Sequence, residues 1–294
     1  MKNLIVNADD LGWTSGVNRG IADAHQRGLV TSTSLLANGS AFDDGVARAR
    51  LLPDLAIGVH LNLSDGAPVS PLGKVPSLVN PAGVFEGGPE SLLMRMATQS
   101  LKTEEVELEW DAQIAKIRDA GVQPSHLDGH KHVQMLPGLF SVALKLAKRH
   151  GIGAIRVSLE NSRLRTYLSS GEDAGGGTVL KQGVQARGLK LLAHDARELA
   201  ARAGISTADF FCGIAQTGVW TRAGVAKLLE TLPEGTTELM CHPGYVDEDL
   251  AKSPTRLQES RRTELDILTD PEIRNIVASQ GIRLIDYKLV TAEA

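Results

Sequence analysis

The sequence predicts an α/β fold, a distorted (β/α) barrel of the TIM type, from two observations. Short apolar runs of strand character alternate with longer amphipathic stretches about seven or eight times along the chain. This alternation indicates parallel strands, because a crossover helix has to carry the chain back to the start of each next strand. The length of 294 residues also falls within the range of one such barrel. A doubly wound open sheet is the alternative.

Each predicted strand is a short apolar or β-branched run, and each predicted helix is an amphipathic stretch. Strands are expected at residues 4–8, 31–37, 56–63, 125–128, 154–158, 210–213, 238–241 and 283–286. Helices are expected at residues 16–27, 104–120, 139–150, 222–232 and 256–268. The segments at about 66–100 and 160–190 are rich in Gly, Pro and Ser, so we expect loop insertions there, within a single domain spanning residues 1–294.

Composition and charge exclude several classes of partner. The net charge of -4, the pI near 6.1 and the lack of like-charge runs argue against nucleic acid or an anionic membrane as the main partner. Long apolar runs and a signal-peptide pattern are lacking, so we expect no membrane span and a cytoplasmic location. Cys212 and Cys241 lie in apolar surroundings and are expected to be buried thiols. The expected partner is a small or neutral molecule. The oligomeric state is left open, with a homodimer among the options.

Three clusters of histidine and aspartate lie far apart in the chain, each at the predicted end of a strand. They are NADD at residues 7–10, GVHLN at residues 58–62 and HLDGHKH at residues 126–132. In a barrel, the carboxyl ends of the strands meet on one face, where active sites form. Imidazole and carboxylate donors from separate strands suit a catalytic divalent metal that keeps one coordination position for water. The clusters therefore predict a metal-dependent hydrolase.

Strand periodicity indicates which of these side chains face the site. Alternation along residues 57–63 places His60 and Asn62 on the side opposite the apolar residues. Asp9 and Asp10 are neighbours, so both can serve one site only if the backbone bends at the strand end. Taken singly, these features also have structural explanations, because paired aspartates often cap a helix. A single His60 or His242 can equally be a satisfied structural or turn histidine.

In their order along the chain, four motifs resemble the YdjC-like carbohydrate deacetylases, the family of chitooligosaccharide deacetylase and hopanoid-biosynthesis-associated proteins. The motifs are NADDLG at residues 7–12, GVHLNL at 58–63, HLDGHKH at 126–132 and HPGY at 242–245. Residues 30–34 and 260–265 are also similar to that family, so the resemblance spans nearly the whole chain. It implies a distorted (β/α) barrel, a divalent metal and the removal of an acetyl group from an N-acetylated sugar or short oligosaccharide.

The resemblance also implies roles for five residues. Asp10, His60 and His130 would bind the metal, Asp9 would be the general base and His242 the general acid. The family often has a more His-rich third motif than the one at residues 126–132. The resemblance implies magnesium, whereas histidine and aspartate ligands also permit zinc, cobalt or iron.

Four further residues are candidates for contacts with substrate or with a ligand. Arg156 is expected either to hold Asp9 ionised through a charge-assisted hydrogen bond or to be a surface arginine. Asp128 is expected to orient a ligand histidine. Asn62 and His132 complete the set. The low aromatic content, 4%, favours a short substrate over a polymer.

Two other functions remain open on the sequence. One is a metal-dependent amidohydrolase or phosphoesterase acting on a substrate that is not a sugar, since the same donors serve such reactions. The other is a carbohydrate-binding protein without turnover.

Overall fold

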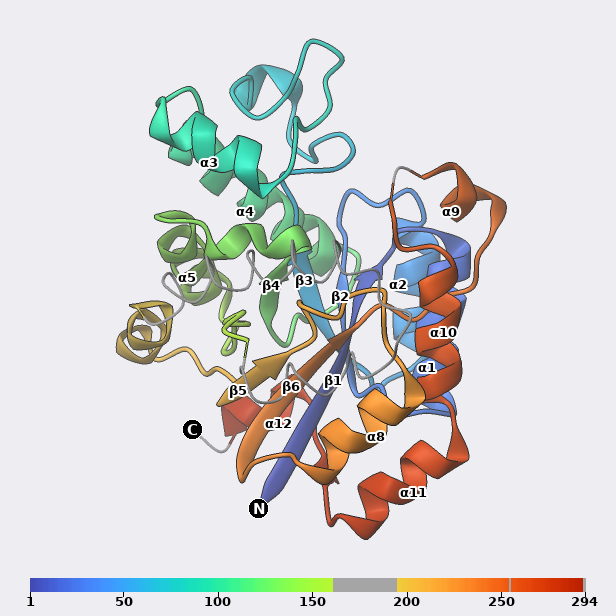
Figure 1. Cartoon of the computed structure of the whole chain (residues 1–294). Coiled ribbons are helices and arrows are strands. Elements are labelled where there is room, and N and C mark those ends of the chain that lie inside the picture. Colours follow the sequence, from blue (N-terminus) through green and yellow to red (C-terminus); the bar gives the residue numbers. More distant parts are fainter. Residues whose placement is uncertain (161–194, 254, 293–294) are drawn as a thin grey trace.

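The computed structural model describes residues 1–160, 195–253 and 255–292, and it confirms the predicted α/β barrel. The strands pair in the order β4-β3-β2-β1-β6-β5, with β7 also paired to β1, and every ladder is parallel. Figure 1 shows helices flanking the strands on both sides. The strands are β1 (Lys2–Leu11), β2 (Ser32–Leu35), β3 (Ala56–Leu61), β4 (Leu127–Gly129), β5 (Phe210–Cys212), β6 (Gly235–Cys241) and β7 (Arg283–Leu284).

Residues 154–160 link the two edge strands and curl the sheet into a barrel. The Leu127 amide on β4 donates to the carbonyl of Ala154 at 3.0 Å, and the Arg156 amide donates back to the Leu127 carbonyl at 2.8 Å. On the other side, Glu160 pairs in parallel with Phe211 of β5. The strand expected at residues 154–158 is therefore present only as isolated bridges. Because these bridges join the edges, the open-sheet alternative is wrong.

Helices cover the outside of the barrel, and all five predicted helices are present. The predicted helix at 256–268 begins later, at Glu259, and α2, α3, α9, α11 and α12 were not predicted. Residues 195–203 are also helical. The helices are α1 (Ser15–Gln26), α2 (Phe42–Leu51), α3 (Pro89–Ala97), α4 (Thr103–Asp119), α5 (Leu139–His150), α8 (Arg222–Glu230), α9 (Glu248–Lys252), α10 (Glu259–Leu268), α11 (Pro271–Ser279) and α12 (Tyr287–Ala292), with 3₁₀ turns η1 (Leu72–Lys74) and η2 (His130–Met135).

The insertion predicted at 66–100 follows β3 and contains η1, α3 and a single bridge between Val79 and Phe85. In Figure 1 it projects beyond the carboxyl ends of the strands. The insertion predicted at 160–190 lies, apart from Glu160, outside the described residues, and the single domain spanning 1–294 stays a prediction. No helix in the described ranges combines the length and apolar character needed to cross a lipid bilayer.

Alternation along β1 separates the main core from the inside of the barrel. Leu4, Val6 and Ala8 belong to the large apolar core. Ile5 belongs to a second, small cluster, where Tyr287 of α12 packs against it. Ile5, Asn7 and Asp9 lie on the same face of β1, because alternate residues of a strand face the same side. Polar side chains therefore follow the small apolar cluster along the inside of the barrel. The sequence thus dedicates one face of β1 to packing and the other to the site.

Both cysteines are buried and unpaired, as predicted. Cys212 ends β5 and Cys241 ends β6. Burial raises the pKa of each thiol well above its ordinary value, so both stay protonated at neutral pH.

Gly58 on β3 is a close-packing position that a stability measurement can test. A Cβ there would lie less than 3.0 Å from atoms of the His126 ring, which stacks on Tyr287 with ring centroids 3.9 Å apart. We expect Gly58→Ala to lower the free energy of unfolding by roughly 1–3 kcal/mol, because the ring cannot yield inside the packed core. Gly73→Ala is the control, since a Cβ there would have no neighbour within 4 Å. Equal urea midpoints for the two variants would contradict this.

Candidate active site

A bend at the end of β1 brings Asp9 and Asp10 to one cavity. The register between β1 and β2 shifts between Ala8 and Leu11, and Asp10 has a φ of 74°, in the left-handed region. Non-glycine residues adopt that region rarely, although Asp does so more readily than most. Both carboxylates line the same cavity as a result. This is the local bend that the sequence required for the two neighbours to share a site.

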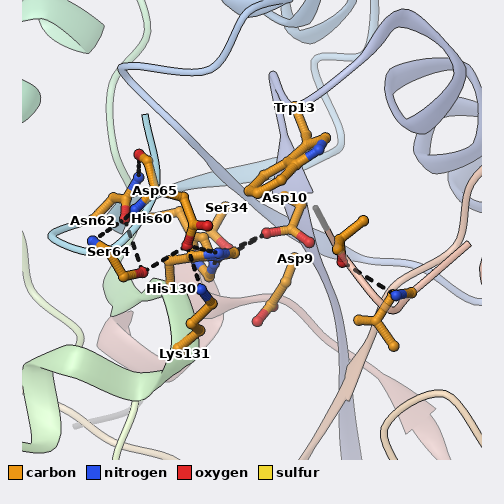
Figure 2. Close-up of polar contacts among 12 residues, drawn as sticks. Asp9, Asp10, Trp13, Ser34, His60, Asn62, Ser64, Asp65, His130 and Lys131 are labelled. Atoms are coloured by element: carbon orange, nitrogen blue, oxygen red, sulfur yellow. Dashed lines mark hydrogen bonds and ion pairs between the residues drawn. The ribbon is translucent and has the colours of Figure 1, made fainter. Parts of the chain in front are cut away.

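Asp10, His60 and His130 converge on a common point (Figure 2). His130 Nδ1 lies 3.0 Å from Asp10 Oδ1 and 3.3 Å from His60 Nε2, and His60 Nε2 lies 3.5 Å from Asp10 Oδ1. Four ligand atoms placed tetrahedrally at about 2.0–2.1 Å from an ion would lie about 3.3 Å apart. The three donor atoms therefore have the spacing of a metal site.

Charge and hydrogen bonding at the cluster also fit a cation. Asp10 Oδ1 is buried without an aligned hydrogen bond, although His130 lies beside it. Burial lowers the pKa of His130, but the negative charges of Asp10 and Asp65 outweigh burial and raise this pKa to about 9. The cluster thus favours positive charge, which a proton on His130 supplies in the metal-free chain and a dication would supply when bound.

Neighbouring groups hold two of the three donors in place. His60 Nδ1 lies 2.8 Å from Asp128 Oδ1 and 3.0 Å from Ser34 Oγ, which leaves Nε2 for the cluster. Asp128 is the register partner of His60 across β3 and β4, which is why the sheet itself places it there. Arg261 of α10 donates to Asp10 Oδ2 at 2.6 Å. Burial opposes ionisation of Asp10, but Arg261 and His130 hold its pKa well below the usual value.

The histidine-rich third motif, residues 126–132, runs from β4 into η2, so its histidines point in different directions. The chain turns into η2, where Lys131 and His132 have φ values of 52° and 59°. His132 turns away from the cluster, with its Nδ1 2.8 Å from Ser158 Oγ. His126 packs against Gly58 of β3 and stacks on Tyr287. The motif therefore contributes His130 to the cluster. His132 still lines the cavity, so its contact with substrate stays a prediction, whereas His126 packs in the barrel interior.

Arg156 is fully buried, so the surface alternative for this residue is wrong. Its guanidinium donates to both oxygens of Asp9 at 2.7 Å and also contacts Asp128 at 3.0 Å and Glu238 at 2.8 Å. The Tyr287 hydroxyl donates to the second oxygen of Glu238 at 2.5 Å. Burial raises the pKa of Asp9, but the bidentate pair with Arg156 outweighs it and lowers that pKa below its usual value. Asp9 is therefore a carboxylate at neutral pH.

His242 lies in the turn after β6 and lines the same cavity. Its backbone amide donates to Glu264 of α10 at 2.5 Å. Burial lowers the pKa of the His242 imidazole to about 4, so the ring is neutral at pH 7 in the substrate-free chain. The sequence led us to expect a protonated His242 near neutral pH, but in the substrate-free chain this imidazole carries no extra proton.

Asn62 follows β3 directly, and its side chain binds the next turn of the chain. Its expected contact with substrate or with a ligand stays a prediction. Its Oδ1 accepts hydrogen bonds from the amides of Ser64 and Asp65 at 2.9 and 3.2 Å, and its Nδ2 donates to the Asp65 carbonyl at 2.8 Å. Asn62 therefore shapes the turn that carries Asp65. The Asp65 carboxylate reaches the cluster, with Oδ2 3.1 Å from His130 Nε2.

The cavity has a volume of about 460 Å³, which is within the range of small-molecule sites. The Trp13 ring forms part of its wall, with its centroid 5.2 Å from that of His130. Apolar and charged groups complete the lining, from both the insertion after β3 and the segments after β5 and β6. They include Pro89, Glu90, Lys131, Ile214, Met240, Arg256 and Leu257.

Arg261, Glu264 and Asp65 contact the site but carried no role in the sequence prediction. Arg261 and Glu264 lie in the segment at 260–265, which resembles the family without indicating contacts. A helix that reads as amphipathic gives no sign that its charged residues point inward. The signal available was the arginine and glutamate at a spacing of three, which places both on one side of α10.

These features define a parallel (β/α) barrel with a candidate divalent-metal centre at the carboxyl ends of its strands. Residues 3–279 match the sequence profile of the family described as YdjC-like protein, and the chain belongs to that family.

Named relatives and a solved structure extend over nearly the whole chain. The carbohydrate deacetylase of Halalkalibacterium halodurans is 34% identical, covering 90% of this chain and 94% of the relative. The chitooligosaccharide deacetylase of an Enterobacter species is 31% identical, covering 96% and 97%. A crystal structure from Enterococcus faecalis, provisionally named a cellobiose-phosphate cleavage protein, is similar with a TM-score of 0.76 at 31% identity, covering 99% of each chain.

The raised pKa of Glu264 predicts a pH dependence of stability. Burial raises this pKa from 4.5 to about 7, so the folded chain keeps a proton that the unfolded chain releases. This contribution is complete below pH 4.5 and is lost as the pH rises toward 7. In metal-free protein, Glu264→Gln should flatten part of the fall in unfolding free energy over that window. Glu259→Gln, exposed on the same helix, is the control. An unchanged slope in the Glu264 variant would contradict the assignment.

Proposed function

We propose that this chain is a metal-dependent hydrolase that removes the acetyl group from an N-acetylated sugar or short oligosaccharide. The observation that carries the proposal is the convergence of Asp10, His60 and His130 within one cavity, beside an ionised Asp9 whose two oxygens both accept from Arg156. Relatives named carbohydrate deacetylase and chitooligosaccharide deacetylase support the choice of reaction.

Asp10, His60 and His130 would hold the metal. When bound there, a divalent ion supplies a lowered pKa for its water and polarisation of the acyl oxygen. Two imidazoles favour a zinc-like ion by ligand softness, whereas magnesium prefers oxygen donors. The experiment below compares zinc with magnesium directly.

Asp9 would accept the proton of the attacking water. Its bidentate pair with Arg156 fixes the carboxylate in one orientation and keeps it ionised. The same pair lowers its basicity, so Asp9 would be effective only toward a water that is already acidified. This requirement ties the role of Asp9 to the neighbouring metal site.

His242 would donate a proton to the departing nitrogen. Because its ring is neutral at pH 7 in the substrate-free chain, that proton has to reach it during the reaction. Asp9 lines the same cavity and would hold the proton taken from water. Transfer of that proton through His242 to the amine balances the hydrolysis, which yields acetate and a free amino sugar.

The cavity wall supports a short sugar as substrate. Figure 2 shows the Trp13 ring beside Asp10, where an aromatic face can pack against the apolar face of a sugar ring. The volume of about 460 Å³ suits one or two sugar units better than an extended polymer.

The experiment that tests the function distinguishes the role of Asp9 as a base from the role of His130 as a metal ligand. Full-length protein loaded with zinc or magnesium is given a panel of N-acetylated mono- and disaccharides, and acetate and bound metal are measured. Asp9→Asn should lower acetate release roughly 100- to 10,000-fold with metal content near that of the unmodified chain. His130→Ala should lower both, because it removes a ligand.

Three results would contradict the proposal. No acetate release from any member of the panel would favour a sugar-binding protein or another hydrolase, and phosphate release from sugar phosphates would favour a phosphoesterase. Loss of metal from Asp9→Asn would place Asp9 among the ligands. Urea unfolding of each variant identifies general loss of structure, since Asp9 also pairs with buried Arg156.

His242→Gln tests proton donation. The variant should keep its metal and lose kcat roughly 100- to 10,000-fold on an acetylated sugar. An activated ester that needs no proton on its leaving group should lose much less. If the ester and the amide lose rate equally, His242 does not act as the proton donor.

A further inference from the structure

We infer that Asp65 is a positioning residue, which fixes the His130 ring with Nδ1 toward the metal centre and Nε2 toward its own carboxylate. The inference rests on the proposed metal centre and adds a residue from the turn after β3. Asp65 contacts His130 and would itself touch neither metal nor reacting atoms.

The two nitrogens of His130 have different surroundings. Nδ1 faces Asp10 Oδ1 at 3.0 Å and His60 Nε2 at 3.3 Å, whereas Nε2 lies 3.1 Å from Asp65 Oδ2. A neutral imidazole carries one N–H, and a carboxylate beside Nε2 keeps the proton there. The lone pair of Nδ1 is then free for a metal.

The contact between Asp65 and His130 acts mainly through charge. The Asp65 oxygen does not align with the Nε2–H bond well enough for a hydrogen bond, so Nε2 is buried without one. A negative charge 3.1 Å away still favours the proton on this nitrogen over the other. Removing the charge while keeping the size of the side chain is therefore the informative change.

His60 provides the comparison within the same site. It directs Nδ1 to Asp128 at 2.8 Å and Nε2 to the cluster, the opposite choice of nitrogen from His130. Each ring has its outer nitrogen against a carboxylate. Asp128 is fixed by strand register, whereas Asp65 belongs to a turn and needs other restraints.

Those restraints come from neighbouring side chains in the turn and in the segment after β2. Asn62 binds the turn through its amide and carbonyl groups, and Asn38 Nδ2 donates to the Asp65 carbonyl at 2.9 Å. Ser64 Oγ donates to Asp65 Oδ2 at 2.8 Å (Figure 2). Lys131 Nζ donates to the same oxygen at 2.5 Å, but this pair is partly exposed, and we assign the restraint to Asn62, Asn38 and Ser64. The left-handed backbone of Lys131 helps to bring its side chain back to this oxygen.

The ion pair between Asp65 and Lys131 offers a simpler explanation for the place of Asp65, which a Lys131 variant can test. The Asp65–Lys131 pair is partly exposed and joins the turn after β3 to η2, so it could merely clip two loops together. A clip would fail equally when either partner is removed. If Asp65 positions His130, zinc binding should weaken only when Asp65 is changed. The positive charge of Lys131 partly offsets the negative charge of the Asp65 oxygen that faces His130, so its removal should not weaken zinc binding.

The experiment measures zinc affinity of the full-length, metal-free chain by competition with a chromophoric chelator. We expect Asp65→Asn to weaken zinc binding roughly 10- to 100-fold, as loss of a group that orients a ligand histidine does. Lys131→Met should bind zinc as tightly as the unmodified chain, or more tightly. Asp54→Asn, an exposed carboxylate just before β3, is the matched control.

A second readout reports the ring itself. In ¹⁵N spectra of the zinc-loaded chain, His130 should show a metal-bound Nδ1 and a protonated Nε2, and Asp65→Asn should disturb this pattern while His60 keeps its own. Asp65→Glu, which keeps the charge but moves it, should bind zinc with an affinity between those of Asp65→Asn and the unmodified chain.

The outcomes distinguish the two proposals. If the unmodified chain binds no zinc or magnesium, the metal centre and the proposed function fail together. If it binds zinc and Asp65→Asn binds equally well, only the role of Asp65 is overturned. Equal weakening by Asp65→Asn and Lys131→Met would assign the pair to loop clipping and would also overturn the inference.

Discussion

The rest of this structure depends on neutralising negative charge inside the barrel. Asp9, Asp128 and Glu238 all point inward from parallel strands, and Arg156 is the cation that meets all three. Isolated carboxylates in such a position would be too costly to keep ionised. Arg156 lies on the irregular segment that joins the sheet edges, so the closure of the barrel and the ionised state of Asp9 and Asp128 depend on one residue.

A second group of charges approaches from outside the sheet. Helix α10 sends Arg261 to Asp10 and Glu264 to the backbone of His242, so one helix braces a proposed ligand and the proposed acid. The two aspartates at the end of β1 thus face different cations, Arg156 for Asp9 and Arg261 for Asp10. This division gives neighbouring residues of the same type different surroundings, which is the condition for giving them different tasks.

Periodicity predicted most of the fold, because burial on one face leaves a record in the sequence. All eight predicted strands coincide with strands or bridges, and the alternation around His60 assigned its face. The missed features depend on contacts between distant residues. Nothing local to Arg261 reveals a partner near the amino end of the chain, and nothing in residues 126–132 shows that two left-handed residues will turn His132 away. Helix α11 could have been found, since Asp270 and Pro271 form a recognisable start.

Tyr287 binds Glu238 from the last helix that the structure describes, and this has a consequence for biosynthesis. The ribosome adds Asp9 first, Arg156 much later and Tyr287 later still. During elongation the earliest strand therefore emerges with acidic groups whose counterparts do not yet exist. A nascent chain cannot complete this interior before Tyr287 has left the exit tunnel, so closure of the barrel is expected to be a late step in its folding.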